Sequence, residues 1–590
     1  MIDYLIEPAQ VHAHRYAVTL KLPRTEGPVR LSLPVWIPGS YLVREFARHL
    51  MNLQATQGKT PCRILQEDKT TWLVDAPGRG AITVRYEVYA NDTSVRAAFL
   101  DARRGFFNGT SVFLCVERQA QGPHRVRITG LPKGWGVATA LKPGQVDAHG
   151  QGWYEAANYD ELVDHPVELG KFWRGQFKAR GIPHELVVTG AADDADLDRL
   201  MADTQRLCEA QIAFWHGRRK PAFDRYVFLL NMVEDGYGGL EHRESTALIC
   251  SRRDIPRRGQ EPAPSEAYTT LLGLISHEYF HTWNVKRLKP SEFAPYDYTR
   301  ENYTRMLWFF EGFTSYYDDQ FLLRTQRIDA AHYLRLLTKP LNQVLATPGR
   351  QVQSVAQASF DAWTRYYRPD ENTANATVSY YTKGSLVALA LDLSLRLGPA
   401  RADGRQPSLD GVMLRLWALQ RPITEDDVVT ALTDEASAPP QHAADWRTQL
   451  NDWVHGTDDL PLQALLTEFG VQWTSRKGPV AQQLGVRVQE ASGSLKAQAV
   501  MHGSAAEAAG ISAGDELIAL DNWRLRRTDD LTQWRRPERS QSLLICRDQQ
   551  LQTLTLAATK ASDWGQVVAL SLASAPTASA ELRRKAWLDR

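Results

Sequence analysis

The chain has 590 residues and a net charge of +1 at pH 7; 43% of its residues are hydrophobic and 23% are charged. This length is too great for one hydrophobic core and indicates about three or four domains. A charge near zero gives no electrostatic basis for binding nucleic acid or an anionic membrane surface. No apolar stretch is long enough to cross a bilayer.

The cysteines and the first residues of the chain favour a reducing compartment. The five cysteines lie far apart and form no Cys-x-x-Cys pair, which argues against a disulfide framework and against a thiolate metal site. Residues 1–20 have no basic start, no continuous apolar stretch and no small-residue cleavage site. They therefore lack the features of a secretory signal, and we expect a cytoplasmic protein.

Residues 1–165 predict a β-rich N-terminal domain. The stretches YAVTLKL (16–22) and AITVRYEVYA (81–90) alternate apolar and polar residues, as half-buried strands do. The second stretch places four apolar side chains on one face: Ile82, Val84, Tyr86 and Val88. Turn residues such as WIPGS (36–40) separate these runs. An antiparallel β-sandwich is the fold class that this pattern favours.

Helical spacing begins after residue 165. Residues 192–217 predict a helix with acidic residues near its start and Gly217 after its end. The apolar run FDRYVFLLNMV (223–233) predicts a strand followed by the turn DGYGG. Residues 265–283 predict a further helix that begins near Ser265. More helices are expected up to about residue 475, in stretches such as SLVALALDLSLRLG and ALLTEFG.

The helix expected from Ser265 carries the sequence His-Glu-x-x-His at residues 277–281. Residues four apart project from one face of a helix, so His277 and His281 can both direct a ring nitrogen at one metal ion. Glu278 lies beside them, where a carboxylate can act on a water molecule. Imidazole and carboxylate ligands with one open position are typical of catalytic zinc.

A catalytic zinc site needs a third protein ligand, and two downstream glutamates are candidates. Glu301 lies in YDYTRENYT, a polar stretch that predicts a loop. Glu311 lies in MLWFFEGFTSYY, among bulky apolar residues. A carboxylate buried there is costly unless a cation offsets its charge, which favours Glu311. A buried ion pair with an arginine is the alternative explanation for Glu311.

HEYFHTWN (277–284), followed by WFFEGFTSYY (308–317), resembles the glycyl aminopeptidase family of zinc metallopeptidases. More distantly it is similar to the alanyl and leucyl aminopeptidases, gluzincins in which a Glu-Gly helix follows the His-Glu-x-x-His helix. The interval between His281 and Glu311 is longer than in that larger family, which indicates an insertion covering KRLKPSEFAPY. The resemblance implies one zinc ion per chain, held by His277, His281 and Glu311.

GGLEH (238–242) looks like the exopeptidase motif of this family, which is usually Gly-x-Met-Glu-Asn. The resemblance implies that Glu241 binds the free amino group of the substrate. It also implies that the edge of this stretch, with Gly238 and Gly239, pairs with the substrate backbone. A carboxylate near the scissile bond can anchor an ammonium group and exclude longer N-terminal extensions. The motif departs from the family at its Leu and His positions.

YYTKG (380–384) resembles the Tyr-x-Lys-Gly segment that supplies a tyrosine to the tetrahedral intermediate. The matching residue is Tyr381, whose phenol can donate a hydrogen bond to the developing oxyanion. The adjacent Tyr380 holds that role if the register differs. A further family segment, PVWIPGSYLVREFARHL (34–50), receives no chemical role from the sequence.

The C-terminal part resembles a PDZ domain. QLGV (483–486) matches the carboxylate-binding loop, with Leu484, Gly485 and Val486, and residues 503–522 match the central helix, turn and strand. Such a domain accepts an extended peptide as an added strand and captures a terminal carboxylate with backbone amides. A PDZ domain that serves only as a packing module is the alternative.

The prediction is therefore a multidomain α+β protein. Its parts are an N-terminal β-rich domain (1–165), a thermolysin-like zinc peptidase domain (166–395), a helical domain (396–477), a PDZ domain (478–562) and a C-terminal tail (563–590).

The predicted function is that of a zinc aminopeptidase acting on peptides with a free N-terminus. Glu278 takes a proton from metal-bound water as it attacks the first peptide carbonyl, then delivers it to the leaving amine. The resemblance implies a preference for Gly or Ala as the first residue. Two alternatives stay open, a zinc endopeptidase that recruits substrates through the PDZ domain and a non-catalytic peptide-binding scaffold. Neither nucleic acid nor membrane is an expected partner.

Overall fold

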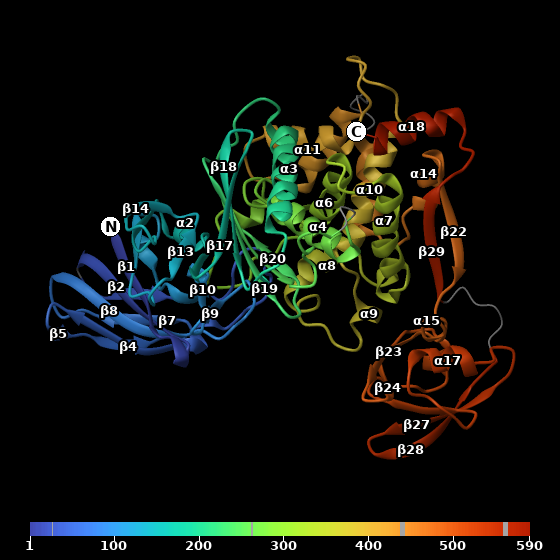
Figure 1. Cartoon of the computed structure of the whole chain (residues 1–590), viewed down its shortest axis with the longest axis horizontal. Helices are drawn as coiled ribbons and strands as arrows, with labels where there is room; N and C mark the ends of the chain where they lie inside the picture. Colours follow the sequence, from blue (N-terminus) through green and yellow to red (C-terminus); the bar gives the residue numbers. More distant parts are fainter. Residues whose placement is uncertain (26, 261–263, 437–442, 559–564, 590) are drawn as a thin grey trace. The chain divides into compact units, whose positions relative to one another are not determined.

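The computed structural model describes residues 1–25, 27–260, 264–436, 443–558 and 565–589. The protein is multidomain, with a β-rich N-terminal region, a helical region and β-sheets near the C-terminus (Figure 1). The chain divides into two compact units. Unit 1 is Met1–Tyr303, Tyr317–Ile328 and Gln420–Ile423, and unit 2 is Thr304–Tyr316, Asp329–Leu419 and Thr424–Arg590.

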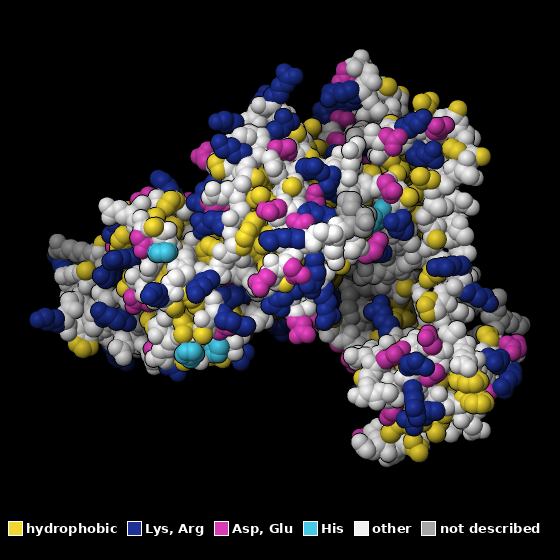
Figure 2. All heavy atoms as spheres, in the orientation of Figure 1, with side chains coloured by type: hydrophobic (Ala, Val, Ile, Leu, Met, Phe, Trp, Pro, Cys, Tyr) yellow, Lys and Arg dark blue, Asp and Glu magenta, His cyan; other side chains and the backbone are white. Residues whose placement is uncertain are grey.

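Basic and acidic side chains lie interspersed over the face drawn in Figure 2, in keeping with the near-neutral charge. Within the described ranges, no helix is both long and apolar enough to cross a bilayer.

The N-terminal region is built on an eight-stranded sheet. Its order is β14 (Lys142–Val146), β15 (Gly152–Ala156), β12 (His124–Ile128), β1 (Ile2–Gln10), β2 (Arg15–Thr25), β8 (Gly80–Tyr89), β4 (Leu50–Gln57) and β5 (Thr60–Pro61). The predicted strands 16–22 and 81–90 are β2 and β8, which confirms both. All four apolar residues expected on one face of β8 are buried. The β1–β12 pair is parallel, so the region departs from a purely antiparallel arrangement.

Two four-stranded sheets complete this region. One has the order β13 (Gly136–Thr139), β16 (Val167–Gly170), β10 (Arg104–Phe107) and β9 (Ala98–Leu100). The other has the order β11 (Cys115–Val116), β3 (Val29–Ser32), β7 (Thr71–Asp75) and β6 (Arg63–Gln66). Side chains from all three sheets share one hydrophobic core.

A five-stranded sheet in unit 1 carries the exopeptidase-like segment. Its order is β17 (Trp173–Ala179), β18 (Ile182–Thr189), β19 (Tyr226–Val233), β21 (Ser245–Ser251) and β20 (Gly238–Glu241). The predicted strand 223–233 is β19, which lies inside the sheet, parallel to both neighbours. Among the described strands, the short β20 pairs with β21 alone, so it is an edge strand.

Two predicted helices pack near this sheet and begin and end where their capping residues lie. Helix α3 (Leu197–His216) ends at Gly217, which has φ of 60°. Helix α4 (Glu266–Phe280) begins at Ser265, whose side chain accepts a hydrogen bond from the Tyr268 N–H. Ser265 is a standard N-cap, and Gly217 supplies a positive φ at the end of α3, which glycine adopts without steric cost. Helix α4 contacts α3, β20 and β21, which brings the His-Glu-x-x-His segment to the edge strand.

Unit 2 holds most of the remaining helices. Those that matter for the site are α5 (Leu307–Phe310), α7 (Ala330–Leu345), α9 (Thr373–Ala376), α10 (Thr382–Leu397) and α14 (Leu462–Glu468). Helix α6 (Gly312–Arg324) follows α5 directly. Helices α11 (Leu409–Ala418), α12 (Glu425–Glu435) and α13 (Ala443–Leu450) lie between α10 and α14 in the chain.

The C-terminal sheet has six strands. Its order is β23 (Val486–Ala491), β24 (Ser494–Val500), β25 (Glu516–Leu520), β27 (Gln541–Arg547) and β28 (Gln550–Leu556), with β26 (Trp523–Arg524) paired to β25. The helices expected here are α16 (Ala505–Ala508) and α17 (Thr528–Trp534), and α15 (Val480–Leu484) precedes β23.

The segment expected to be a tail, 563–590, contains regular structure. Strand β29 (Gln566–Leu572) pairs with β22 (Val471–Lys477) along its whole length, and α18 (Ala578–Leu588) follows. The buried Trp587 contacts the rings of Tyr333 and Phe469. The sequence prediction missed these elements because their partners lie far away in the chain. The predicted boundary at 562 falls within 559–564, outside the described residues.

Candidate active site

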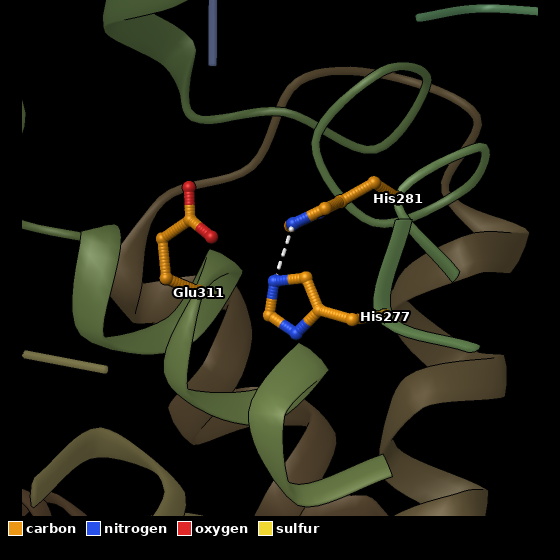
Figure 3. Close-up of side chains that lie close together, drawn as sticks. All are labelled: His277, His281 and Glu311. Atoms are coloured by element: carbon orange, nitrogen blue, oxygen red, sulfur yellow. Dashed lines mark hydrogen bonds between the residues drawn. The ribbon is translucent and has the colours of Figure 1, made fainter. Parts of the chain in front are cut away.

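His277 and His281 lie at the end of α4 with their rings directed at one point. The Nε2 atoms of the two rings are 3.1 Å apart, and both side chains are drawn in Figure 3. His281 donates from Nδ1 to the carbonyl oxygen of Asn284 at 2.8 Å. His277 makes a 3.0 Å hydrogen bond from Nδ1 to Oδ2 of Asp318. Each ring is therefore oriented through its outer nitrogen, as in protein metal sites.

Glu311 is the third member of this cluster. One ligand atom from each of His277, His281 and Glu311 lies within 4.8 Å of the other two, and Figure 3 shows the carboxylate directed toward the imidazoles. Glu311 is 2% exposed and lies between α5 and α6. Among the described residues, this is the group of three that could hold a metal ion, and Glu301 is not part of it.

Glu278 is buried on α4 and lies against β20. A Cβ atom on Gly239 would overlap the Glu278 carboxylate. Since a glycine has no Cβ, the backbone of the edge strand can approach the carboxylate closely. The predicted general base and the predicted substrate-binding strand are thus neighbours. Their close approach explains why the motif has a glycine at position 239.

Glu241 ends β20 and is 4% exposed. Its carboxylate is approached by Gly39, where an added Cβ would overlap the Glu241 oxygens. Gly39 has φ of +94°, a conformation that favours glycine. The N-terminal segment 34–50 therefore has a structural role that the sequence did not indicate, because it closes against the predicted amine-binding residue.

The residue after Glu241 joins a buried charge cluster. The Asp164 carboxylate accepts a 2.6 Å hydrogen bond from Lys286 and lies 3.3 Å from Nδ1 of His242. Burial acts to raise the pKa of Asp164, but the Lys286 ammonium, His242 and Arg243 together hold that pKa well below its usual value. Asp164 is therefore a carboxylate in the folded protein, and it anchors the end of β20.

Tyr381 precedes α10, and Tyr380 is fully buried beside it. Burial and the nearby Glu311 carboxylate raise the pKa of Tyr381 well above its ordinary value, so the phenol stays protonated. The Tyr381 hydroxyl also lies 3.3 Å from that of Tyr367. A Cβ on Gly384 or on Gly312 would overlap backbone of the other segment, so the glycines of the two motifs let α10 pack closely against α5 and the first residue of α6.

Two contributors were missed by sequence reasoning. Asp318, which orients His277, lies two turns after Glu311 on α6, and that helical spacing is a signal the sequence does contain. The sequence contains no such signal for Gly39, because Gly39 and Glu241 are far apart in the chain.

The residues of the predicted carboxylate loop lie at the start of the C-terminal sheet. Leu484 ends α15, Gly485 adopts φ of 73°, and Val486 begins β23. A cavity of about 1440 Å³ adjoins this loop, and its lining is mainly apolar. Its wall includes parts of α7, α9, β22, β23 and β29.

The chain is similar to proteins of known class. The model described as M61 glycyl aminopeptidase matches residues 270–387, and the Peptidase M61 N-terminal domain matches residues 3–171. The crystal structure of an aminopeptidase N family protein from Idiomarina loihiensis is 36% identical, with a TM-score of 0.91 and 100% of both chains covered. The comparison with curated protein sequences gives no match.

Two further structures match with lower similarity. An M1 zinc metallopeptidase from Deinococcus radiodurans is 14% identical, with a TM-score of 0.49, covering 78% of this chain and 94% of that one. Native yeast LTA4 hydrolase is 12% identical, with a TM-score of 0.46, covering 79% of this chain and 70% of that one.

The full-length likeness, together with the family match over the His-Glu-x-x-His helix, makes this protein a metallo-aminopeptidase, a hydrolase. The chain belongs to the M61 glycyl aminopeptidase family.

Proposed function

We propose that His277, His281 and Glu311 hold one zinc ion. The donor chemistry supports this: with both Nδ1 atoms donating to oxygens, both Nε2 atoms carry lone pairs, and these are 3.1 Å apart. Two lone pairs that face each other beside a buried carboxylate are stabilised by a cation between them. A zinc ion there would polarise the scissile carbonyl and acidify a water molecule.

The surrounding side chains carry the proton transfers and the substrate contacts in this proposal. Glu278 accepts a proton from the attacking water and passes it to the leaving amine. Tyr381 donates a hydrogen bond to the developing oxyanion, a role that its raised pKa favours. Glu241 binds the substrate ammonium group, and the edge of β20, with Gly238 and Gly239, pairs with the substrate backbone.

The substrate class is peptides with a free N-terminus, with Gly or Ala preferred as the first residue, as the family resemblance implies. The observation that carries the proposal is the cluster of two imidazoles and a buried carboxylate, with Glu278 on the same helix and against β20.

The test uses matched substrates on the full-length protein. Glycyl, alanyl and leucyl peptides should be hydrolysed, with the first two preferred, and their N-acetylated forms should not be. Chelation should abolish hydrolysis, and zinc should restore it. Equal hydrolysis of acetylated peptides would instead support an endopeptidase. No hydrolysis of any peptide by zinc-loaded protein would support a scaffold.

The domain assignments are also proposals. We assign residues 166–395 to a thermolysin-like catalytic domain, 396–477 to a helical domain and 478–562 to a PDZ domain. The left-handed Gly485 between α15 and β23 supports the last assignment, since the loop turns there before an exposed strand.

A second function, peptide binding, is favoured by the cavity beside this loop. The lining contains Arg350, Arg476, Arg487 and His502, and none of the described lining residues is Asp or Glu. Arg350 pairs with Asp459 and His502 with Glu507, whereas Arg476 and Arg487 make no ion pair among the described residues. A mainly apolar cavity with these two arginines and no lining carboxylate matches an extended peptide that ends in a free carboxylate. We propose such a C-terminal peptide as the ligand.

A further inference from the structure

Arg96 reaches from the N-terminal region to the edge strand β20. Its Nη2 donates to the carbonyl oxygen of Gly239 at 3.3 Å. Its Nη1 and Nη2 lie 3.8 and 3.9 Å from the position that a Cβ on Gly238 would occupy. The guanidinium group therefore lies beside the two glycines of the exopeptidase-like segment.

In the part of the chain that the structure describes, the charge of Arg96 has no anionic partner. Among the described residues, no carboxylate lies within 4.0 Å of its guanidinium, and its buried Nε has no hydrogen-bond acceptor. Two other arginines in unit 1 differ: Arg104 pairs with Glu168, and Arg243 pairs with Asp160, both at 2.7 Å. A half-buried guanidinium without an anion is well suited to bind one, since its planar donors match a carboxylate.

The direction of a bound peptide follows from two contacts, and this step rests on the proposed function. The proposed amine-binding residue, Glu241, is at the C-terminal end of β20, and the proposed base, Glu278, lies against Gly239. A peptide extended from the first contact to the second runs antiparallel to β20. At about 3.3 Å per residue, its next residue lies near Gly238, where the Arg96 guanidinium is.

We propose that Arg96 binds the C-terminal carboxylate of short peptides, so that dipeptides with both ends free are the preferred substrate class. In a dipeptide, the residue after the scissile bond carries the free carboxylate. Glu241 then binds the positive end of the substrate and Arg96 the negative end. In a longer peptide, a neutral peptide carbonyl replaces the carboxylate beside Arg96, so the charge-assisted hydrogen bonds weaken.

The experiment compares alanyl-alanine with its C-terminal amide on the zinc-loaded wild type and on Arg96→Gln. In the wild type, amidation should lower kcat/KM about 10- to 100-fold, as expected for losing hydrogen bonds between charged groups. In Arg96→Gln, the two substrates should be hydrolysed at similar rates. The acid-to-amide ratio is the readout, because the variant also loses the hydrogen bond to the Gly239 carbonyl and should hydrolyse both substrates somewhat more slowly.

Two further variants make the result decisive. Arg96→Lys keeps the charge but not the paired donors and should show an intermediate preference for the acid. Arg103→Gln removes an 86% exposed arginine that pairs with Asp101 and should keep the wild-type preference. An unchanged acid-to-amide ratio in Arg96→Gln would overturn the inference, and so would an equal loss on both substrates. Failure of the proposed function would look different, because the wild type would then hydrolyse neither peptide.

Discussion

Two regions of this protein carry proposed peptide-binding roles, and they differ in what forms the site. Around α4 and β20, the groups are buried carboxylates and imidazoles, and glycines let the backbone approach them. In the C-terminal sheet, the main feature is a loop conformation at Gly485 beside a mainly apolar cavity. Proposed peptide binding in the first region depends on side-chain chemistry, whereas in the second region it depends on the shape of the backbone.

This difference predicts how each region should respond to amino-acid substitution. A site made of buried charges is sensitive to the loss of one group, because each charge relies on its neighbours. A groove that recognises backbone and a terminal carboxylate tolerates side-chain changes but not a changed loop. The predictions below use substitutions that distinguish the two regions.

Glu278→Gln should have the largest effect on hydrolysis. The amide keeps the shape of the side chain but cannot accept the proton, so kcat should fall about 10²- to 10⁴-fold. Zinc content, measured by metal analysis, should stay the same. Glu266→Gln, an exposed change in the first turn of the same helix, should leave kcat unaltered. A fully active Glu278→Gln protein would disprove the mechanism.

Lys286→Met should have the largest effect on stability, because it leaves the Asp164 carboxylate buried without its closest cation. Removing one partner of a buried pair costs about 3–5 kcal/mol, measurable by urea unfolding at pH 7. Lys142→Met breaks an exposed pair and should cost less than about 1 kcal/mol.

The pH dependence of this loss follows from the lowered pKa of Asp164. A group whose folded pKa is depressed contributes stability that is complete above its unfolded value, about 3.9, and is lost as the pH falls toward the folded value. Between pH 7 and pH 3 the wild type should therefore lose more of this contribution than Lys286→Met, whose Asp164 lacks that cation, so the difference between the two proteins should shrink. The same difference at pH 7 and at pH 3 would argue against a charged Asp164.

The sequence allowed the local features of the first region to be predicted. The start of α4 at Ser265, the end of α3 at Gly217 and the strand β19 all follow from capping residues and apolar periodicity within one stretch of chain. Glu311 was favoured over Glu301 by its apolar neighbours, and the structure groups it with the two histidines. The ligand roles of these residues stay predictions until metal is measured.

The features that could not be predicted depend on contacts between distant residues. Asp164 and Lys286 are far apart in sequence, as are Gly39 and Glu241, and no periodicity links them. For the same reason, the pairing of β29 with β22 was missed, although the alternating apolar residues of β29 were present in the sequence. A local sequence pattern predicts that a stretch forms a strand or a helix. Which other element that stretch contacts depends on tertiary packing.

Gly239→Ala should have an intermediate effect on hydrolysis. The added methyl group would overlap the Glu278 carboxylate and displace either the base or the edge strand. A displacement of about 1 Å can cost about 10²-fold in rate, so kcat/KM should fall about 10- to 100-fold with zinc retained.

The control is Gly273→Ala on α4, where the nearest atom to an added Cβ is 3.8 Å away. This variant should stay active and gain about 0.5–1 kcal/mol, since alanine favours a helix interior. Wild-type activity in Gly239→Ala would show that Glu278 does not need its position against β20.

Gly485→Ala should have the smallest effect on hydrolysis and should act only on the second region. Gly485 has φ of +73°, and an added Cβ would overlap the Ser504 side chain, so the loop must change shape. Binding of a fluorescent peptide with a free C-terminus, measured by anisotropy, should be lost, while hydrolysis of alanyl-alanine should stay at the wild-type rate.

The control is Gly493→Ala. Gly493 has nearly the same φ, +75°, with no atom within 4 Å of the added Cβ, and this variant should retain binding. Because both alanines carry similar backbone strain, a difference between them isolates the loop shape. Peptide binding by Gly485→Ala at the wild-type level would show that the cavity is not a carboxylate-binding groove. Loss of both peptide binding and dipeptide hydrolysis in this variant would show that the two regions do not act independently.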